Sequence, residues 1–313
     1  MDLRPEDFEF DLVEVLRSVV AITTNIPDDA VTANVLGTER SGNGVLIDDG
    51  IVLTIGYLIT EAKNVWISLS NGTTVPGHVL GYDQETGFGL VQALGPIQEQ
   101  PVELGDSDAM HVGSRVVMCG AGGVSRAVEA NVVARQEFAG YWEYVLESAI
   151  FTAPAHPHWG GTAVLSGEGK LVGIGSLQVQ HAEVDGQEDV DLNMVVPINL
   201  LKPILNDLLT IGQAKRPPRP WLGVYATEIE GNIVVAGIAE SGPNENSGLQ
   251  IGDIVLAVDD QDIDDLAGFF RKVWSLGEAG VDVPLQVHRS GQVIDITLHS
   301  ADRRKLLKGP VVH

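Results

Sequence analysis

Two histidines stand two residues apart in a short loop that ends in a pair of glycines. The loop covers residues 155–163 and contains His156, His158, Gly160 and Gly161. A neutral imidazole can act as a general base beside a hydroxyl nucleophile, or it can ligate zinc. The loop is therefore the first place in the chain to look for reactive chemistry.

Each chemistry needs further groups around the histidines. A base would need a hydroxyl such as that of Ser148 or Ser176 within hydrogen-bond reach, and a third group to orient the ring. A zinc site would need at least a third ligand, and the sequence shows none at a recognised spacing. We therefore expect ordinary loop histidines, with no metal and no cofactor.

Short strands must position this loop, because they make up most of the chain. Turn signals such as Asp48-Asp49-Gly50 and Asn71-Gly72 separate apolar runs, a pattern typical of a sandwich or barrel. Two sets of strands are predicted in tandem. The first set is 19–23, 44–47, 51–53, 65–69 and 74–79, and the second is 115–119, 127–134, 144–152, 163–165, 171–178 and 193–196.

The hydrophobic period changes after Pro197. Apolar residues at helical spacing predict a helix over 201–211, with Asn199 as its N-cap and Gly212 at its end. We therefore divide the chain into an N-terminal arm (1–16, strand or short helix), a β domain ending in that helix (17–213), a proline-rich linker (214–220), a second domain (221–300) and a tail (301–313). In the second domain we expect five strands and one amphipathic helix.

Composition narrows the classes of partner. The formal net charge is −24, which opposes binding to nucleic acid or to an anionic membrane surface. The single cysteine, Cys119, excludes a disulfide within the chain. The N-terminus lacks the basic and apolar regions of a signal peptide, and no stretch is apolar for long enough to span a membrane.

Several motifs, in order along residues 17–300, resemble the HtrA family of trypsin-like serine proteases with a C-terminal PDZ domain. They are Ser41-Gly42-Asn43-Gly44, Leu104-Gly105-Asp106-Ser107, Gly160-Gly161, Val196-Pro197-Ile198-Asn199, Pro220-Trp221-Leu222-Gly223-Val224 and Ser247-Gly248-Leu249-Gln250-Ile251-Gly252-Asp253. The resemblance implies a mainly β protein, with a chymotrypsin-like double β-barrel followed by a PDZ-like β/α domain.

The resemblance also locates the catalytic positions, and other residues occupy them. Tyr57 stands where the family has its histidine, Gly87 where it has its aspartate, and Trp159 where it has its serine. Pro157 takes the place of a glycine whose N–H forms half of the oxyanion hole, and proline has no N–H. We expect the Trp159 indole to fill the old cleft, with Tyr57 as its neighbour.

From these four positions we predict that the chain is not an enzyme, but a catalytically inactive homologue acting as a peptide-binding or regulatory scaffold on a serine endopeptidase fold. The alternative is an active serine-type endopeptidase, in protein quality control, with relocated catalytic residues such as His156 or His158.

By resemblance, the peptide-binding site lies in the PDZ-like domain. PDZ domains bind extended peptides by strand addition and capture the terminal carboxylate with backbone N–H groups. The implied residues are Trp221, Leu222, Gly223, Val224, Phe269, Phe270 and Val273. The partners would be peptide or protein C-termini, unless the groove is filled by the chain itself.

The resemblance also implies a bacterial homotrimer, with Phe8 and Phe10 as candidate interface residues. It implies the periplasm, whereas the missing signal peptide leaves the cytoplasm open.

Overall fold

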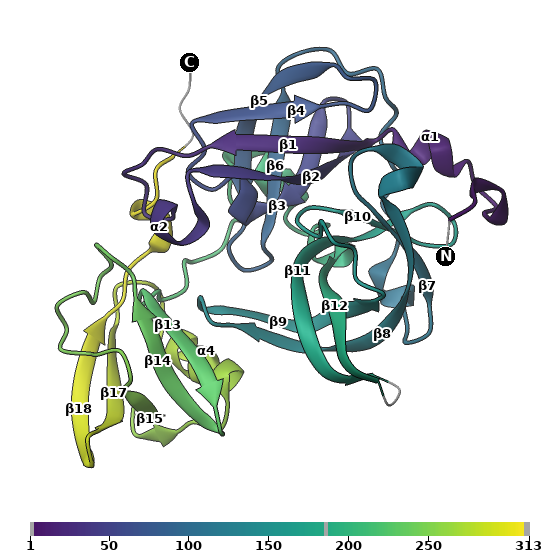
Figure 1. The fold of residues 1–313 in the computed structure, drawn as a ribbon. Coiled ribbons are helices and arrows are strands. Elements are labelled where there is room, and N and C mark those ends of the chain that lie inside the picture. The colour runs from purple at the N-terminus through teal and green to yellow at the C-terminus, as the bar shows by residue number, and fades with distance from the viewer. Residues whose placement is uncertain (1–2, 185–186, 310–313) are drawn as a thin grey trace. The chain divides into compact units, whose positions relative to one another are not determined.

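The chain forms two compact units (Figure 1). The computed structural model describes residues 3–184 and 187–309. The first unit takes in the chain up to residue 136 and residues 148–215, and the second comprises residues 137–147 and 216–308. Residues 137–147 are the tip of the hairpin between β8 (Ala127–Gly140) and β9 (Tyr144–Ala153). The second unit is therefore built from two separate stretches of sequence.

The first unit consists of two closed six-stranded barrels, which confirms the mainly β, double-barrel prediction. The strand order is β1-β2-β3-β6-β5-β4 in the first barrel and β10-β11-β12-β9-β8-β7 in the second. The strands besides β8 and β9 are β1 (Val19–Asn25), β2 (Glu39–Asp48), β3 (Ile51–Ile55), β4 (Asn64–Ser68), β5 (Thr74–Tyr82), β6 (Phe88–Ala93), β7 (Arg115–Cys119), β10 (Ala163–Leu165), β11 (Leu171–Val184) and β12 (Gln187–Pro197).

Local sequence explains the hairpins of the first barrel. The Asp48-Asp49-Gly50 turn joins β2 to β3, and every residue of β3 is buried in the barrel. The Asn71-Gly72 turn joins β4 to β5, with the Asn71 side chain accepting a hydrogen bond from the Thr73 N–H at 2.8 Å. Sequence reasoning missed β6, which pairs with both β3 and β5 and closes the barrel.

Short helices connect the strands. They are η1 (Pro5–Asp7), α1 (Leu12–Leu16), α2 (Ala33–Leu36), η2 (Gly56–Leu58), η3 (Ser107–Ala109), η4 (Gly123–Arg126), η5 (Ile198–Leu200) and α3 (Leu205–Ile211). α3 ends at Gly212 as predicted, but its N-cap is Ile204. The N-cap prediction for Asn199 is wrong, because that side chain instead donates to the Asp106 carboxylate at 2.6 Å. In the described ranges, no helix is long and apolar enough to cross a membrane.

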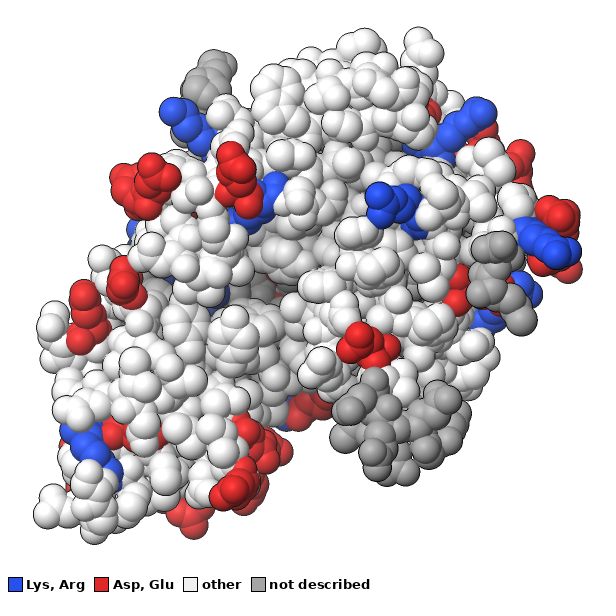
Figure 2. Space-filling view, in the orientation of Figure 1, with Lys and Arg blue, Asp and Glu red and all other residues white. Residues whose placement is uncertain are grey.

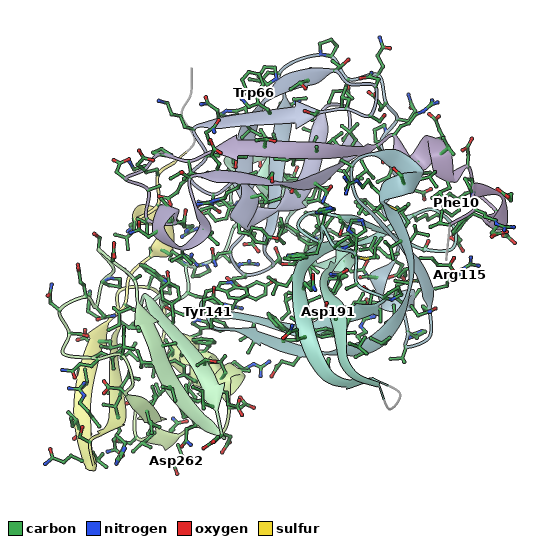
Figure 3. The ribbon with its side chains drawn as sticks, viewed as in Figure 1. Phe10, Trp66, Arg115, Tyr141, Asp191 and Asp262 are labelled. Atoms are coloured by element: carbon green, nitrogen blue, oxygen red, sulfur yellow. The ribbon has the colours of Figure 1, made fainter. Side chains whose placement is uncertain are left out.

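The N-terminal arm is helical and its aromatic residues pack within the chain. The rings of Phe8 and Phe10 meet edge to face, and the Arg115 guanidinium lies 5.2 Å from the centre of the Phe8 ring. Figure 3 labels Phe10 and Arg115 in this region. The predicted homotrimer through these residues stays a prediction.

The second unit is a β-sheet with one main helix. Its strand order is β13-β14-β15-β17-β18, with β16 paired to β15, so β13 lies at an edge of the sheet. The elements are β13 (Val224–Ile229), β14 (Asn232–Ile238), β15 (Ile254–Val258), β16 (Gln261–Asp262), α4 (Leu266–Ser275), β17 (Asp282–Arg289), β18 (Gln292–His299) and η6 (Arg303–Lys305). The predicted five strands and amphipathic helix are all present.

Candidate functional site

The predicted triad positions come together in the first unit. The Gly56 N–H donates to the carbonyl of Gly87 at 2.7 Å, which places Gly87 next to the short helix η2 that carries Tyr57. Tyr57 and Trp159 line the same cavity of about 480 Å³, between residues of both barrels. Trp159 is only half-buried, so the indole narrows the cleft without filling it.

Tyr57 is held by a hydrogen bond. Its hydroxyl donates to the carbonyl of Ser176 at 2.7 Å. Burial raises the pKa of the phenol above its usual range, so the group stays protonated at neutral pH. A protonated phenol whose proton is already shared with a carbonyl cannot accept a proton from a nucleophile.

His156 is a buried structural residue, with 1% of its surface exposed. Its Nδ1 accepts a hydrogen bond from the His158 N–H at 3.1 Å, so the ring proton lies on Nε2, which donates to the carbonyl of Arg126 at 2.9 Å. Burial lowers the pKa of the imidazole, which favours this neutral form. Both ring nitrogens are occupied, so His156 has no nitrogen left for Ser148, Ser176 or a metal.

The other loop positions offer no compensating group. His158 and Pro157 are exposed. Within residues 3–184 and 187–309, no cluster of three His, Cys, Asp or Glu side chains could hold a metal ion. The one cysteine, Cys119, is fully buried.

Asn43 fixes the shape of the loop, a role that sequence reasoning missed. Its Nδ2 donates to the carbonyls of His158 and Gly160 at 2.9 and 3.0 Å, and its Oδ1 accepts from the Ala121 N–H at 2.8 Å. Asn43 lies in the Ser41-Gly42-Asn43-Gly44 motif, which was the only sequence signal for it. Because Asn43 lies in β2, these hydrogen bonds hold the loop of residues 155–163 against the first barrel.

Gly161 is required where the loop meets β2. Its φ is +77°, and a Cβ atom there would lie 1.9 Å from the carbonyl oxygen of Asn43. Its N–H donates to the carbonyl of Gly175 at 2.8 Å. Any side chain at this position would push the loop away from the first barrel.

A second candidate site lies in the second unit, where the loop before β13 gathers backbone donors. The N–H groups of Leu222, Gly223 and Val224 all point at one oxygen, Oε1 of Glu143, at 3.1, 2.8 and 3.1 Å. The Leu222 N–H also lies 3.1 Å from Oε2. Leu222 and Gly223 belong to the predicted carboxylate loop, and Val224 to the strand predicted to pair with the peptide. In this structure their ligand is a side-chain carboxylate of the same chain.

The turn that carries Glu143 also contacts β13, the edge strand of the sheet. The Ala226 N–H of β13 donates to the carbonyl of Tyr141 at 3.0 Å, and the rings of Tyr141 and Tyr225 meet edge to face at 5.9 Å. Tyr141 is labelled in Figure 3, where it lies beside β13. The turn that carries Glu143 thus contacts both the carboxylate loop and the edge strand.

Burial dominates the electrostatics of Glu143, of which only 8% is exposed. Desolvation raises the pKa of its carboxyl group from 4.5 to about 7, while the three N–H groups and the charge of Arg303 act in the opposite direction. The carboxyl group therefore titrates near neutral pH.

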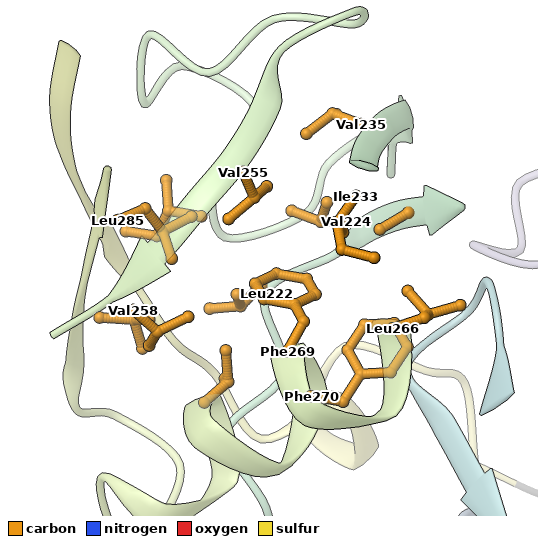
Figure 4. Packing of buried hydrophobic residues seen from close by; sticks show 14 of the residues in the cluster. Leu222, Val224, Ile233, Val235, Val255, Val258, Leu266, Phe269, Phe270 and Leu285 are labelled. Carbon is orange, nitrogen blue, oxygen red and sulfur yellow. The ribbon is translucent and has the colours of Figure 1, made fainter. Parts of the chain in front are cut away.

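The predicted apolar pocket residues lie inside the core. Phe269 and Phe270 point from α4 towards Leu222 and Val224 (Figure 4). Val273 of the same helix belongs to the same buried cluster. Trp221 borders the loop and is also buried. Val145, two residues after Glu143, belongs to the same buried cluster.

Comparisons with known proteins match both units. Residues 42–174 fit the model of the trypsin-like peptidase domain, and residues 220–299 fit that of the PDZ domain. The chain is a homologue of the HtrA proteases. It is 23% identical to the serine protease Do-like HtrA of Bacillus subtilis, over 90% of this chain and 70% of that protein. It is 25% identical to the periplasmic serine endoprotease DegP of Salmonella typhimurium, over 82% of this chain and 56% of that protein.

Solved HtrA structures share the fold. The HtrA-type protease AlgW, solved with a decapeptide, has a TM-score of 0.53 at 20% identity, over 95% of this chain and 98% of that chain. The serine endoprotease from Yersinia pestis has a TM-score of 0.51 at 19% identity, over 92% and 95% of the two chains. The trypsin-like and PDZ assignments are thereby confirmed.

The matches overturn one prediction. We predicted from the residue types at positions 57, 87, 157 and 159 that the chain is not an enzyme, and this prediction is wrong, because the relatives of this HtrA homologue are named serine proteases. Residue type at four positions was too narrow a basis for a statement about the whole chain.

Proposed function

We propose that this HtrA homologue binds the C-terminal ends of peptides or proteins in the groove of its PDZ domain, in a regulatory or scaffolding role. The observation that carries the proposal is the convergence of three backbone N–H groups, from residues 222 to 224, on a carboxylate at the start of an edge strand. Converging backbone donors of this kind bind a carboxylate, and an edge strand can accept an added strand.

The acidic surface fits this kind of ligand recognition. On the face drawn in Figure 2, acidic side chains lie scattered over the surface with basic ones between them. With a net charge of −24, general electrostatic attraction for anions is weak, so a peptide carboxylate depends on local N–H donors. We therefore infer that the backbone geometry of the N–H donors selects the ligand's carboxylate.

The proposal also covers the chemistry of the predicted triad positions. We propose that Tyr57, Gly87 and Trp159 do not form a Ser-His-Asp triad, and that Pro157 contributes no oxyanion donor. Two observations support this: the Tyr57 proton is shared with the Ser176 carbonyl, and Gly87 serves as a backbone acceptor in a tight turn. Relocated catalysis through His156 is not favoured, because its ring nitrogens are both engaged.

Peptide binding can be measured with a matched pair of ligands. A fluorescein-labelled decapeptide ending in valine is prepared as the free acid and as the C-terminal amide, and its binding to the full chain is followed by fluorescence anisotropy. We expect the free acid to bind on the order of ten-fold tighter or more, because hydrogen bonds to a charged group contribute about 1.5–3 kcal/mol. Equal affinities for the two peptides would contradict carboxylate capture.

A further inference from the structure

The turn between β8 and β9 occupies the groove in the manner of a bound peptide. The Glu143 carboxylate fills the loop of N–H donors, the Tyr141 carbonyl pairs with β13, and the Val145 side chain enters the apolar cluster. A PDZ ligand uses the same three kinds of contact: a terminal carboxylate, strand pairing and an apolar side chain.

The docked turn carries two energetic costs, one in its backbone and one in its buried carboxylate. Glu143 is a non-glycine residue with a φ of +61°, a conformation that costs about 1–2 kcal/mol. Its carboxylate is buried, and burying a charge is costly unless hydrogen bonds offset the loss of water. Its hydrogen bonds come from the loop that also defines the proposed peptide site. Contact with that loop therefore offsets both costs.

We propose that Glu143 is an internal ligand of the PDZ groove, and that an incoming peptide C-terminus must displace it to bind. This inference rests on the proposed function and states how peptide binding would be regulated. While the turn is docked, only the undocked fraction of the molecules can bind a peptide, so the apparent affinity falls by that fraction. Displacement frees the turn of residues 140–144 at the same time.

The variant Glu143→Gly tests the proposal, because it removes the carboxylate and retains a residue that adopts a positive φ. The matched control is Glu230→Gly: Glu230 also has a positive φ, +51°, in a hairpin turn of the same unit, but it is exposed. Glu143→Gln is a second variant that keeps the size of the side chain and removes its charge.

Binding of the free-acid and amide decapeptides is measured for the full-length chain and each variant. We expect Glu143→Gly to bind the free acid on the order of ten-fold tighter than the unmodified chain, which corresponds to a groove docked in about nine of ten molecules. Glu143→Gln keeps an acceptor oxygen and should change the affinity little, and Glu230→Gly should not change it. The amide should gain by the same factor as the free acid in Glu143→Gly, because docking blocks both ligands alike. An unchanged affinity for the free acid in Glu143→Gly would overturn the proposal.

A readout without peptide separates this inference from the proposed function. Hydrogen exchange of the amides of residues 222–224 should become faster in Glu143→Gly, because the donors lose their acceptor. It should change little in Glu143→Gln, which keeps an acceptor oxygen, and stay unchanged in Glu230→Gly. If no form of the chain prefers the free acid, the proposed function fails, and faster exchange still supports an internal ligand. If exchange is unchanged in Glu143→Gly, the internal ligand is refuted whatever the peptide data show. Circular dichroism of each variant controls for folding.

Discussion

The raised pKa of Glu143 predicts that docking of the β8–β9 turn depends on pH. The docked carboxyl group has a pKa of about 7, against 4.5 for the exposed group. The docked state holds the carboxyl proton more tightly than the undocked state does. Protonation therefore stabilises docking fully below pH 4.5, and this stabilisation is lost as the pH rises through 7. Docking should therefore weaken between pH 5 and pH 8.

The magnitude follows from the two pKa values. Proton linkage with pKa values of 4.5 and about 7 lowers the docking equilibrium roughly 70-fold between pH 5 and pH 8, or about 2.5 kcal/mol. Of the neighbouring groups, the Tyr225 phenol has a pKa that burial raises above its usual range, so it stays neutral between pH 5 and pH 8.

Hydrogen exchange of the amides of residues 222–224 is the direct assay. Protection factors, corrected for the pH dependence of intrinsic exchange, should fall by up to about 70-fold from pH 5 to pH 8 in the unmodified chain. The control is Glu143→Gln, which cannot titrate and should show no such slope. Protection that rises with pH would refute the reasoning, because it would mean that the three N–H donors and Arg303 outweigh desolvation and favour the charged form.

Two further predictions concern the first unit, and both are checked by denaturant unfolding of the full chain. Gly161→Ala should lower the free energy of unfolding by about 1–3 kcal/mol more than Gly72→Ala does. Both glycines have a positive φ, but a Cβ atom at Gly161 would overlap the Asn43 carbonyl, whereas Gly72 faces open space. Equal losses would contradict the close approach of the loop to Asn43. Tyr57→Phe should cost about 1–3 kcal/mol, because the buried Ser176 carbonyl loses its donor; an unchanged free energy of unfolding would show that water replaces the phenol.

The strands and barrels could be predicted because their signals are local. Turn residues such as Asn71-Gly72 fix where a hairpin reverses, and alternating burial follows from the pleat of a strand. β6 was missed because Gly89 breaks its apolar run and the preceding residues, Thr86 and Gly87, form a tight turn. The Asn199 prediction failed because a cap depends on where the helix starts, and the chain makes a short 3-10 helix first.

The contacts of Glu143 could not be predicted from local patterns. The residue lies 79 positions before Leu222, and nothing in the run Tyr141-Trp142-Glu143-Tyr144 resembles a ligand motif. Periodicity, turn residues and helix caps are local signals, and none of them shows which turn enters a distant groove. The same limit applies to His156, whose neutral tautomer is fixed by the Arg126 carbonyl 30 residues earlier.

The discontinuity of the second unit bears on how that unit is made and isolated. Residues 137–147 leave the ribosome well before residues 216–308, so the complete unit can form only after the whole of the first unit has been synthesised. A fragment limited to residues 216–308 would lack Val145 from its core and Glu143 from its carboxylate loop. Such a fragment would be less stable but would bind peptides more readily, and its affinities would overstate those of the intact protein.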